Sequence, residues 1–434
     1  MSPGPNAGPP KLGMELSLKS TTSKAAFALG SLLLVGLFEL SSVRQYLAFR
    51  QYEQLTAPAL QAAIRLDPWN SDYAHLLGRI HLYDDQDFNA ARTAIEQAAA
   101  LNPHNARYWL DLASVAQVTG DTQAEAAALE RAERSEPTMP EVSWEVANFY
   151  LLRGDLPKAF ASFGRVERYS PQLRKRAAEL SWRMQPDVNV QLQYVPHTVD
   201  ALSSLLQVLY EQQKFPEAAT VWQNLAALHQ PMDTNFARTY LSHLLSYKHP
   251  QLEQAQVVWR DLVAINPEMA EYGSTNNLVV NGNFEHDVLD WGFDWQYAKR
   301  PHVDVAQESG IFHSGSRSLS VSFDGEDIED FGIFQYVPVK PNSRYNLQAF
   351  VRTDDVVGSS GPRLAVTSPY DFSKRFYISD DILGSSLWSA HGGNFSTGAD
   401  TQMVAIVLLR DAPYTPIKGH LWLDDVTLVQ EGGP

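Results

Sequence analysis

The chain has 434 residues, with 34 Lys and Arg against 50 Asp and Glu, a formal net charge of −16 and no cysteine. This acidity excludes a phosphate-binding surface built from clustered cations, so we expect no nucleic-acid partner. The lack of cysteine excludes a disulfide scaffold, a thiolate zinc site and a cysteine nucleophile. Apolar residues make up 44%, and with this length they predict two or three folded domains.

The first segment is polar and is followed by an apolar stretch. Residues 1–23 are rich in Pro, Gly and Ser and predict a disordered cytoplasmic tail. Ala25–Phe38 carries no charge, and a spanning helix needs about 20 mostly apolar residues. We therefore predict a signal-anchor transmembrane helix over 24–43, with the preceding lysines in the cytoplasm. The alternatives are a cleaved secretory signal and a helix of a soluble domain.

Residues 50–270 contain an internal repeat. Prolines in similar contexts recur at positions 68, 103, 137 and 171, and again at 196, 231 and 267, at intervals of 34 to 36 residues. Between them, apolar residues follow helical spacing in two helices per unit. Such helix pairs cannot bury their apolar faces alone, so we predict an α-solenoid of stacked pairs. The stretch 172–195 breaks the period and predicts one helix followed by an irregular connection.

The repeats resemble the tetratricopeptide repeat. The second unit carries the resemblance well, with Trp109, Leu112-Ala113, Gly120-Asp121 and Pro137. The resemblance implies a groove, lined by the first helix of each unit, that holds a segment of a partner protein. In this register the groove residues are Arg107, Gln117, Trp144 and Asn148. The alternative for Trp144 is a place in the core.

Residues 274–434 predict a separate β domain. Helical periodicity stops near Gly273, and short runs of alternating polarity bounded by turn residues replace it. This pattern predicts an antiparallel β-sandwich. The predicted strands are 278–285, 302–306, 317–323, 331–339, 343–353, 363–368, 375–379, 403–409 and 420–429.

Four motifs in this domain, in order, resemble the jelly-roll carbohydrate-binding modules. They are Asn281–Glu285, His313–Leu319, Pro341–Leu347 and Leu421–Val426. In that family the opening Glu and the closing Asp hold a structural calcium ion. The resemblance therefore implies Glu285 and Asp424 as calcium ligands, with Asp425 in reserve. The alternative is that these carboxylates cap strand ends and accept hydrogen bonds from the protein.

A sugar-binding surface needs flat aromatic faces beside polar groups. From Glu268 onward the chain has 23 acidic and 11 basic residues, a net charge of −12, so a neutral or cationic glycan fits better than an anionic one. The candidate glycan contacts are the aromatic residues that lie outside clear strand alternation. They are Trp291, Trp295, Tyr370, Phe372, Trp388 and Tyr414. For Trp291 and Trp295 the alternative is a structural role in the core.

No catalytic motif is recognisable, and the adjacent carboxylate pairs are typical of solvated turns, so we predict that the chain is not an enzyme. It resembles bacterial repeat proteins associated with envelope polysaccharides. The resemblance implies a single-pass inner-membrane adaptor with its bulk in the periplasm, whose solenoid binds a partner protein and whose jelly roll binds a neutral polysaccharide. The alternative is a purely protein–protein scaffold whose jelly roll binds no sugar.

Overall fold

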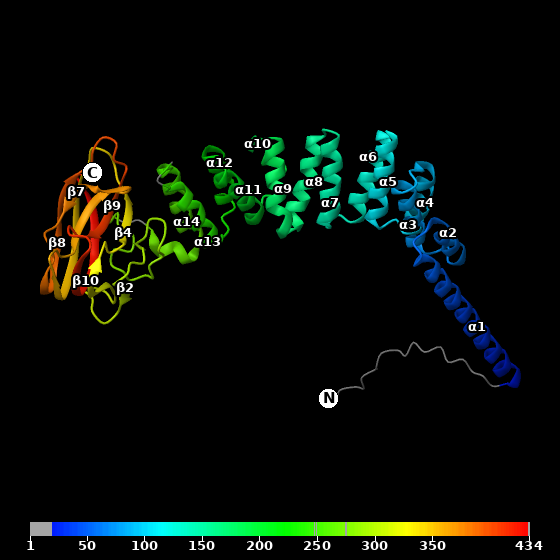
Figure 1. Cartoon of the computed structure of the whole chain (residues 1–434), viewed down its shortest axis with the longest axis horizontal. Coiled ribbons are helices and arrows are strands. Elements are labelled where there is room, and N and C mark those ends of the chain that lie inside the picture. The colour runs from blue at the N-terminus through cyan, green and yellow to red at the C-terminus, as the bar shows by residue number, and fades with distance from the viewer. Residues whose placement is uncertain (1–19, 247, 249, 274–275, 433–434) are drawn as a thin grey trace, which may run out of the picture. The chain divides into compact units, whose positions relative to one another are not determined.

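The computed structural model describes residues 20–246, 248, 250–273 and 276–432 (Figure 1). The tail predicted over 1–23 therefore lies almost entirely outside the described residues. The chain forms two compact units that divide between Tyr169 and Ser170, within the predicted solenoid.

The first unit is entirely helical in its described part. Its helices are α1 (Thr21–Tyr52), α2 (Ala57–Leu66), α3 (Ser71–Tyr83), α4 (Phe88–Leu101), α5 (Ala106–Thr119), α6 (Thr122–Ser135), α7 (Pro140–Leu152) and α8 (Leu156–Tyr169). The pairs α3/α4, α5/α6 and α7/α8 are the first three predicted repeats. They confirm the repeat prediction.

Local sequence explains why these helices begin where they do. The side chains of Asn70, Asp87, Asn105 and Asp121 each accept a hydrogen bond from a backbone N–H in the first turn of the following helix. Gly78 lets α3 approach α4 closely, because a Cβ atom there would lie 2.4 Å from the Ile95 side chain. These features fix helix pairs whose apolar faces must be covered by neighbouring pairs.

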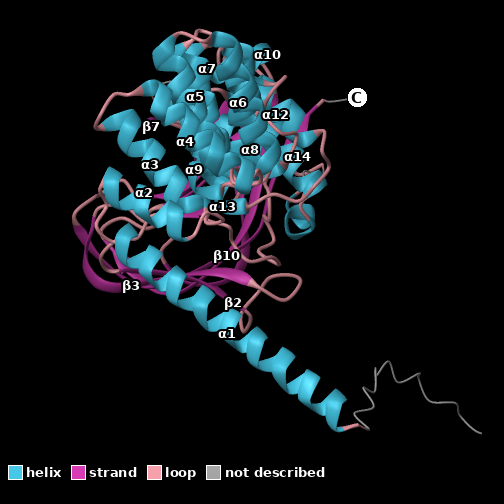
Figure 2. Ribbon diagram, turned by 90° about the vertical axis from the view of Figure 1, so that its right-hand side faces the viewer, coloured by secondary structure: helices cyan, strands magenta, loops and turns pink. Residues whose placement is uncertain are grey.

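Helix α1 is longer than the predicted 24–43 segment, and most of it makes no contact with the rest of its unit. It is one unbroken helix (Figure 2), and Ala48 is its only buried residue. Near its end, the ring of Tyr52 lies 5.3 Å from the ring of Tyr73 in α3. The described part of the chain has one helix, this one, that is long and apolar enough to cross a membrane.

The second unit continues with helices and then changes to strands. The helices are α9 (Pro171–Met184), α10 (Val188–Gln191), α11 (Val199–Glu211), α12 (Phe215–Ala226), α13 (Thr234–Leu244), α14 (Leu252–Ile265) and the 3-10 helix η1 (Pro267–Tyr272). The pairs α11/α12 and α13/α14 are the last two predicted repeats. The expected irregular connection contains the short helix α10.

The strands form two antiparallel sheets. They are β1 (Gln296–Tyr297), β2 (Val303–Glu308), β3 (Ser318–Ile328), β4 (Ile333–Pro338), β5 (Arg344–Gly358), β6 (Arg363–Ser368), β7 (Asp371–Ile378), β8 (Gly384–Ser396), β9 (Met403–Leu409) and β10 (Thr415–Glu431). Sheet A has the order β1-β4-β9-β6-β7 and sheet B the order β2-β3-β10-β5-β8. The orders β4-β9-β6-β7 and β3-β10-β5-β8 are those of a jelly roll, which confirms the predicted fold.

One predicted strand is wrong. Residues 278–285 form bends and turns, because Asn281 and Phe284 have positive φ angles of 49° and 54° that an extended strand does not allow. The segment still pairs locally with β10, since the N–H of Val426 donates to the carbonyl of Gly282 at 2.7 Å.

The last repeat and the sandwich share one hydrophobic core. Trp259 of α14 packs edge-on against Trp291 and Phe293, with ring centroids 5.5 and 5.8 Å apart. The hydroxyl of Tyr272 donates to the carbonyl of Asp287 at 2.6 Å. Met403, at the start of β9, belongs to the same cluster. Helix α14 therefore covers one end of the outer face of sheet A.

Candidate functional site

A group of aromatic side chains lies on the outer face of sheet A. Along β4, Ile333 and Val337 point into the sandwich core, whereas Phe334 and Tyr336 point outward and are partly exposed. The Phe334 ring lies 5.1 Å from that of Tyr336 and 6.1 Å from that of Phe372. Tyr336 lies 6.1 Å from Tyr370. We call Phe334, Tyr336, Tyr370 and Phe372 the aromatic platform.

Small side chains lie beneath this platform, and charged groups lie beside it. Ala405 of β9 is opposite both Tyr336 and Thr367, so it lies on the same face. Thr367 in turn is opposite Arg375 of β7, whose guanidinium forms an ion pair with Asp411 at 2.8 Å. The face thus combines flat rings with a guanidinium and a carboxylate, the groups that a pyranose ring requires.

The structure separates the aromatic residues predicted from the sequence. Tyr370 and Phe372 lie together on the platform. Trp388 is on the outer face of sheet B, with its ring 5.7 Å from that of His313. Tyr414 is 65% exposed in the turn before β10. Phe334 and Tyr336 were not among the predicted contacts, because those were all taken from outside the strands. The alternation along 331–339 nevertheless places both on the face opposite the core residues.

The prediction that Trp291 and Trp295 contact a glycan is wrong. Trp295 is 1% exposed and packs against Phe284 in the sandwich core. Trp291 is 9% exposed and packs against Trp259 of α14. Neither ring therefore offers a free face to a sugar. Their burial instead stabilises the core and the junction with the last repeat.

The predicted calcium ligands hold the loop that contains residues 313–317. Glu285 accepts hydrogen bonds from the N–H groups of Ser316 and Arg317, at 2.6 and 3.0 Å. Asp424 is fully buried and accepts from the N–H groups of His313 and Ser314, at 2.8 and 3.2 Å. Asp425 holds the same loop, with its Oδ2 atom 2.6 Å from the His313 ring.

The pKa values of Asp424 and Glu285 shift in opposite directions. Burial raises the pKa of Asp424, and the backbone donors offset this only in part. For Glu285, burial also favours the protonated form, but the hydrogen bonds from Ser316 and Arg317 outweigh it and lower the pKa.

Calcium needs six to eight oxygen ligands. In the structure the oxygens of Glu285 and Asp424 accept hydrogen bonds from N–H and O–H donors, as expected if these carboxylates hold the loop, and calcium binding stays a prediction. Among the described residues, no three or more His, Asp or Glu side chains gather as metal ligands. In the structure both carboxylates accept hydrogen bonds from the loop 313–317 and hold it in place.

The predicted groove residues lie on α5 and α7, which are the first helices of the second and third repeats. Arg107 of α5 donates to Glu145 of α7 at 2.8 Å. The neighbouring Trp144 packs edge-on against Phe163 of α8, as the structural alternative proposed. Asn148 donates to the carbonyl of Trp144, and Gln117 is partly exposed on α5.

A charged cluster on this face was not recognised from the sequence. Asp111 of α5 is 2% exposed, and its Oδ2 atom lies 2.6 Å from Nε2 of His75 and 3.8 Å from Nε of Arg79. Arg107 lies 3.8 Å from the other oxygen of Asp111. The sequence pattern that could have identified this cluster is the i, i+4 spacing of His75 with Arg79 on α3 and of Arg107 with Asp111 on α5.

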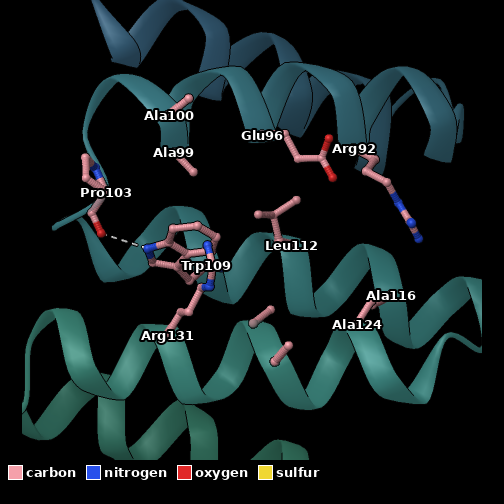
Figure 3. Close-up of a pocket in the computed structure, with 12 residues that line it drawn as sticks. Arg92, Glu96, Ala99, Ala100, Pro103, Trp109, Leu112, Ala116, Ala124 and Arg131 are labelled. Carbon is pink, nitrogen blue, oxygen red and sulfur yellow. Dashed lines mark hydrogen bonds between the residues drawn. The ribbon is translucent and has the colours of Figure 1, made fainter.

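A groove opens on the other side of α5, lined by α4, α5 and α6. Its cavity of about 540 Å³ has a floor of alanine side chains together with Trp109 and Leu112. Figure 3 shows Arg131 stacked on the Trp109 ring, and the two lie 4.8 Å apart. The indole N–H donates to the carbonyl of Pro103 at 2.9 Å, which fixes the ring.

Residues 80–140 match the tetratricopeptide-repeat family model. No curated protein matches the chain. Among solved structures, a CBM4 module is 12% identical, with 35% of this chain and 99% of that chain covered and a TM-score of 0.28. A family 16 carbohydrate-binding module is 20% identical (35% and 99% covered, TM-score 0.27), and the MamA protein is 16% identical (44% and 91% covered, TM-score 0.25).

The helical repeats and the jelly roll offer distinct surfaces. The repeats present a charged face and an apolar groove. The jelly roll presents the aromatic platform. Several carboxylates of the sandwich are held in ion pairs rather than aimed at a cleft, as Asp381 is by Arg363 and Asp330 by Arg300.

Proposed function

We propose that the chain is a non-enzymatic adaptor anchored in a membrane, whose repeats dock a partner protein and whose jelly roll binds an uncharged glycan. The aromatic platform carries this proposal. Its rings lie side by side on one sheet face, as a row of sugar rings requires, and Arg375 with Asp411 supplies hydrogen bonds beside them.

The membrane part of the proposal rests on α1. Ten large apolar side chains between Phe27 and Val43 are more than half exposed, which is costly in water and favourable in lipid. We propose that this helix stays in a bacterial inner membrane and that the repeats and the jelly roll lie in the periplasm. There the adaptor would serve the assembly or export of an envelope polysaccharide, as the sequence resemblance implies.

Glycan binding is tested by retention on an array of neutral, amino and acidic oligosaccharides, with the full chain in detergent. We expect retention on neutral glycans. Phe334→Ala and Phe372→Ala should each weaken binding at least about tenfold, because a buried aromatic ring contributes roughly 1.5–3 kcal/mol. Trp69→Ala, an exposed aromatic residue of the repeats, is the matched control. Loss of binding in this control but not in the platform variants would contradict the assignment.

The alternative is a scaffold that binds only proteins. It is favoured by the groove at Trp109 and the charged cluster around Asp111, which do not depend on the sandwich. Under this alternative, a partner is cross-linked to residues of the repeats, the array gives no signal, and platform variants leave partner capture unchanged.

A further inference from the structure

A second cavity lies where the last repeat meets sheet A. It has a volume of about 710 Å³, and both parts of the second unit build its walls. The repeat contributes the start of α14, and the sandwich contributes the β6–β7 turn and the segment before β9. We call it the junction pocket, lined among others by Gln251, Glu253, Tyr370, Lys374, Asp400 and Gln402.

Tyr370 joins this pocket to the aromatic platform. Its ring lines the pocket and also lies 6.1 Å from the ring of Tyr336. Its hydroxyl donates to the carbonyl of Leu245, before α14, at 3.1 Å. The last repeat therefore fixes the ring of Tyr370, which belongs to both the aromatic platform and the junction pocket. The platform is thus continuous with the pocket.

The polar groups of the pocket suit a sugar ring. Amides of Gln251 and Gln402, carboxylates of Glu253 and Asp400 and the ammonium group of Lys374 surround an aromatic ring. Within the described part of the chain, neither carboxylate nor the ammonium group forms an ion pair. Two carboxylates against one ammonium group disfavour an anionic sugar such as a uronic acid.

We propose that the junction pocket binds the terminal residue of an uncharged glycan chain whose following sugars lie on the aromatic platform. This inference rests on the proposed function and adds to it the part of the glycan that is recognised. A sheet face open at both ends would accept the middle of a polysaccharide. Here α14 packs on the sheet beyond Tyr336 and Met403, so the chain must stop at the pocket.

The inference is tested with the full chain in detergent and hexasaccharides of the cello, xylo and manno series, by calorimetric titration. We expect Glu253→Gln from the repeat and Asp400→Asn from the sandwich each to weaken binding about tenfold, the loss of hydrogen bonds to a charged group. Ser368→Trp, which fills the pocket, should act similarly. Asp304→Asn, an exposed carboxylate on sheet B, is the matched control, and melting temperatures show that each variant folds.

A second measurement reads the end of the glycan directly. The matching neutral polysaccharide, intact or partly hydrolysed by acid, is compared at equal mass, and binding capacity should rise in proportion to the number of chain ends. The inference fails if capacity is unchanged, or if the pocket variants bind like the native chain while Phe372→Ala does not bind; the proposed function then stands. No binding of any glycan by the native chain overturns both.

Discussion

Asp294 is a fully buried carboxyl group near the junction of the last repeat with the sandwich. Its Oδ2 atom accepts a hydrogen bond from the N–H of Leu289 at 2.7 Å, whereas Oδ1 has no partner among the described residues. Burial raises the pKa of Asp294 to about 7, although backbone donors partly offset this. The side chain therefore makes the stability of the second unit depend on pH.

The direction of this dependence follows from proton binding. Between about pH 4 and 7 the folded chain holds a proton on Asp294 that the unfolded chain has lost. The contribution of Asp294 to the free energy of unfolding therefore falls as the pH rises through this range, and it is constant above about pH 7. The full contribution is up to about 4 kcal/mol. We expect Asp294→Asn to flatten the slope in urea unfolding followed at pH 5 and pH 7.5. Asp304→Asn should keep the native slope, and an unchanged slope in Asp294→Asn would refute the assignment.

At the scale of elements, the contact between α14 and the segment 291–293 depends on a glycine. Gly292 has a positive φ of 67°, and a Cβ atom there would lie 2.5 Å from the ring of Trp259. We expect Gly292→Ala to lower the unfolding free energy of the second unit by about 2 kcal/mol or more, because backbone strain adds to overpacking.

A matched variant separates these two causes. Gly384 also has a positive φ, of 74°, but a Cβ atom there would meet nothing within 4 Å. Gly384→Ala should therefore be less destabilising than Gly292→Ala when both are measured by urea unfolding. Equal losses would mean that strain alone acts and that the contact with Trp259 is not tight.

Elements with strong periodicity could be predicted from the sequence, and those without it could not. The repeat pairs and most strands follow from apolar spacing and turn residues. Strand β8 was missed because Gly392-Gly393 and polar side chains interrupt its alternation, and its pairing with β5 supplies what its own sequence lacks. The segment 278–285 alternates like a strand but turns at Asn281 and Phe284.

The candidate site was predictable only in part for the same reason. Tyr370 and Phe372 were found because they lie near a turn. Their neighbours Phe334 and Tyr336 come from another strand, and only the strand order of sheet A brings the four rings together. The junction pocket depends on how α14 packs, which no local pattern encodes.

At the scale of the whole molecule, the proposed membrane location rests on α1. We expect the native chain to sediment with membranes, to resist carbonate extraction and to be released by detergent. Its intact mass should include residues 21–52, since a cleaved signal would remove the apolar part. Leu33→Arg with Leu34→Arg should reduce the membrane fraction, because each charge at the centre of a span costs roughly 2.5–3.5 kcal/mol.

Topology needs its own control. Protease added outside spheroplasts should digest residues 50–432, while a cytoplasmic marker stays intact. Leu152→Arg, an exposed apolar position in the repeats, should leave the membrane fraction unchanged. Protection of the bulk of the chain would reverse the proposed orientation.

Trp259 of the last repeat packs against residues of the sandwich, so the two parts depend on each other. A sandwich produced without the repeats would expose the apolar side chains of Trp291 and Phe293 to solvent. It would also lose the wall of the junction pocket that α14 forms. A cut at the boundary between helix and strand should therefore destabilise the sandwich. We expect the sandwich to keep its native stability only together with the adjoining helical hairpin, which covers these rings.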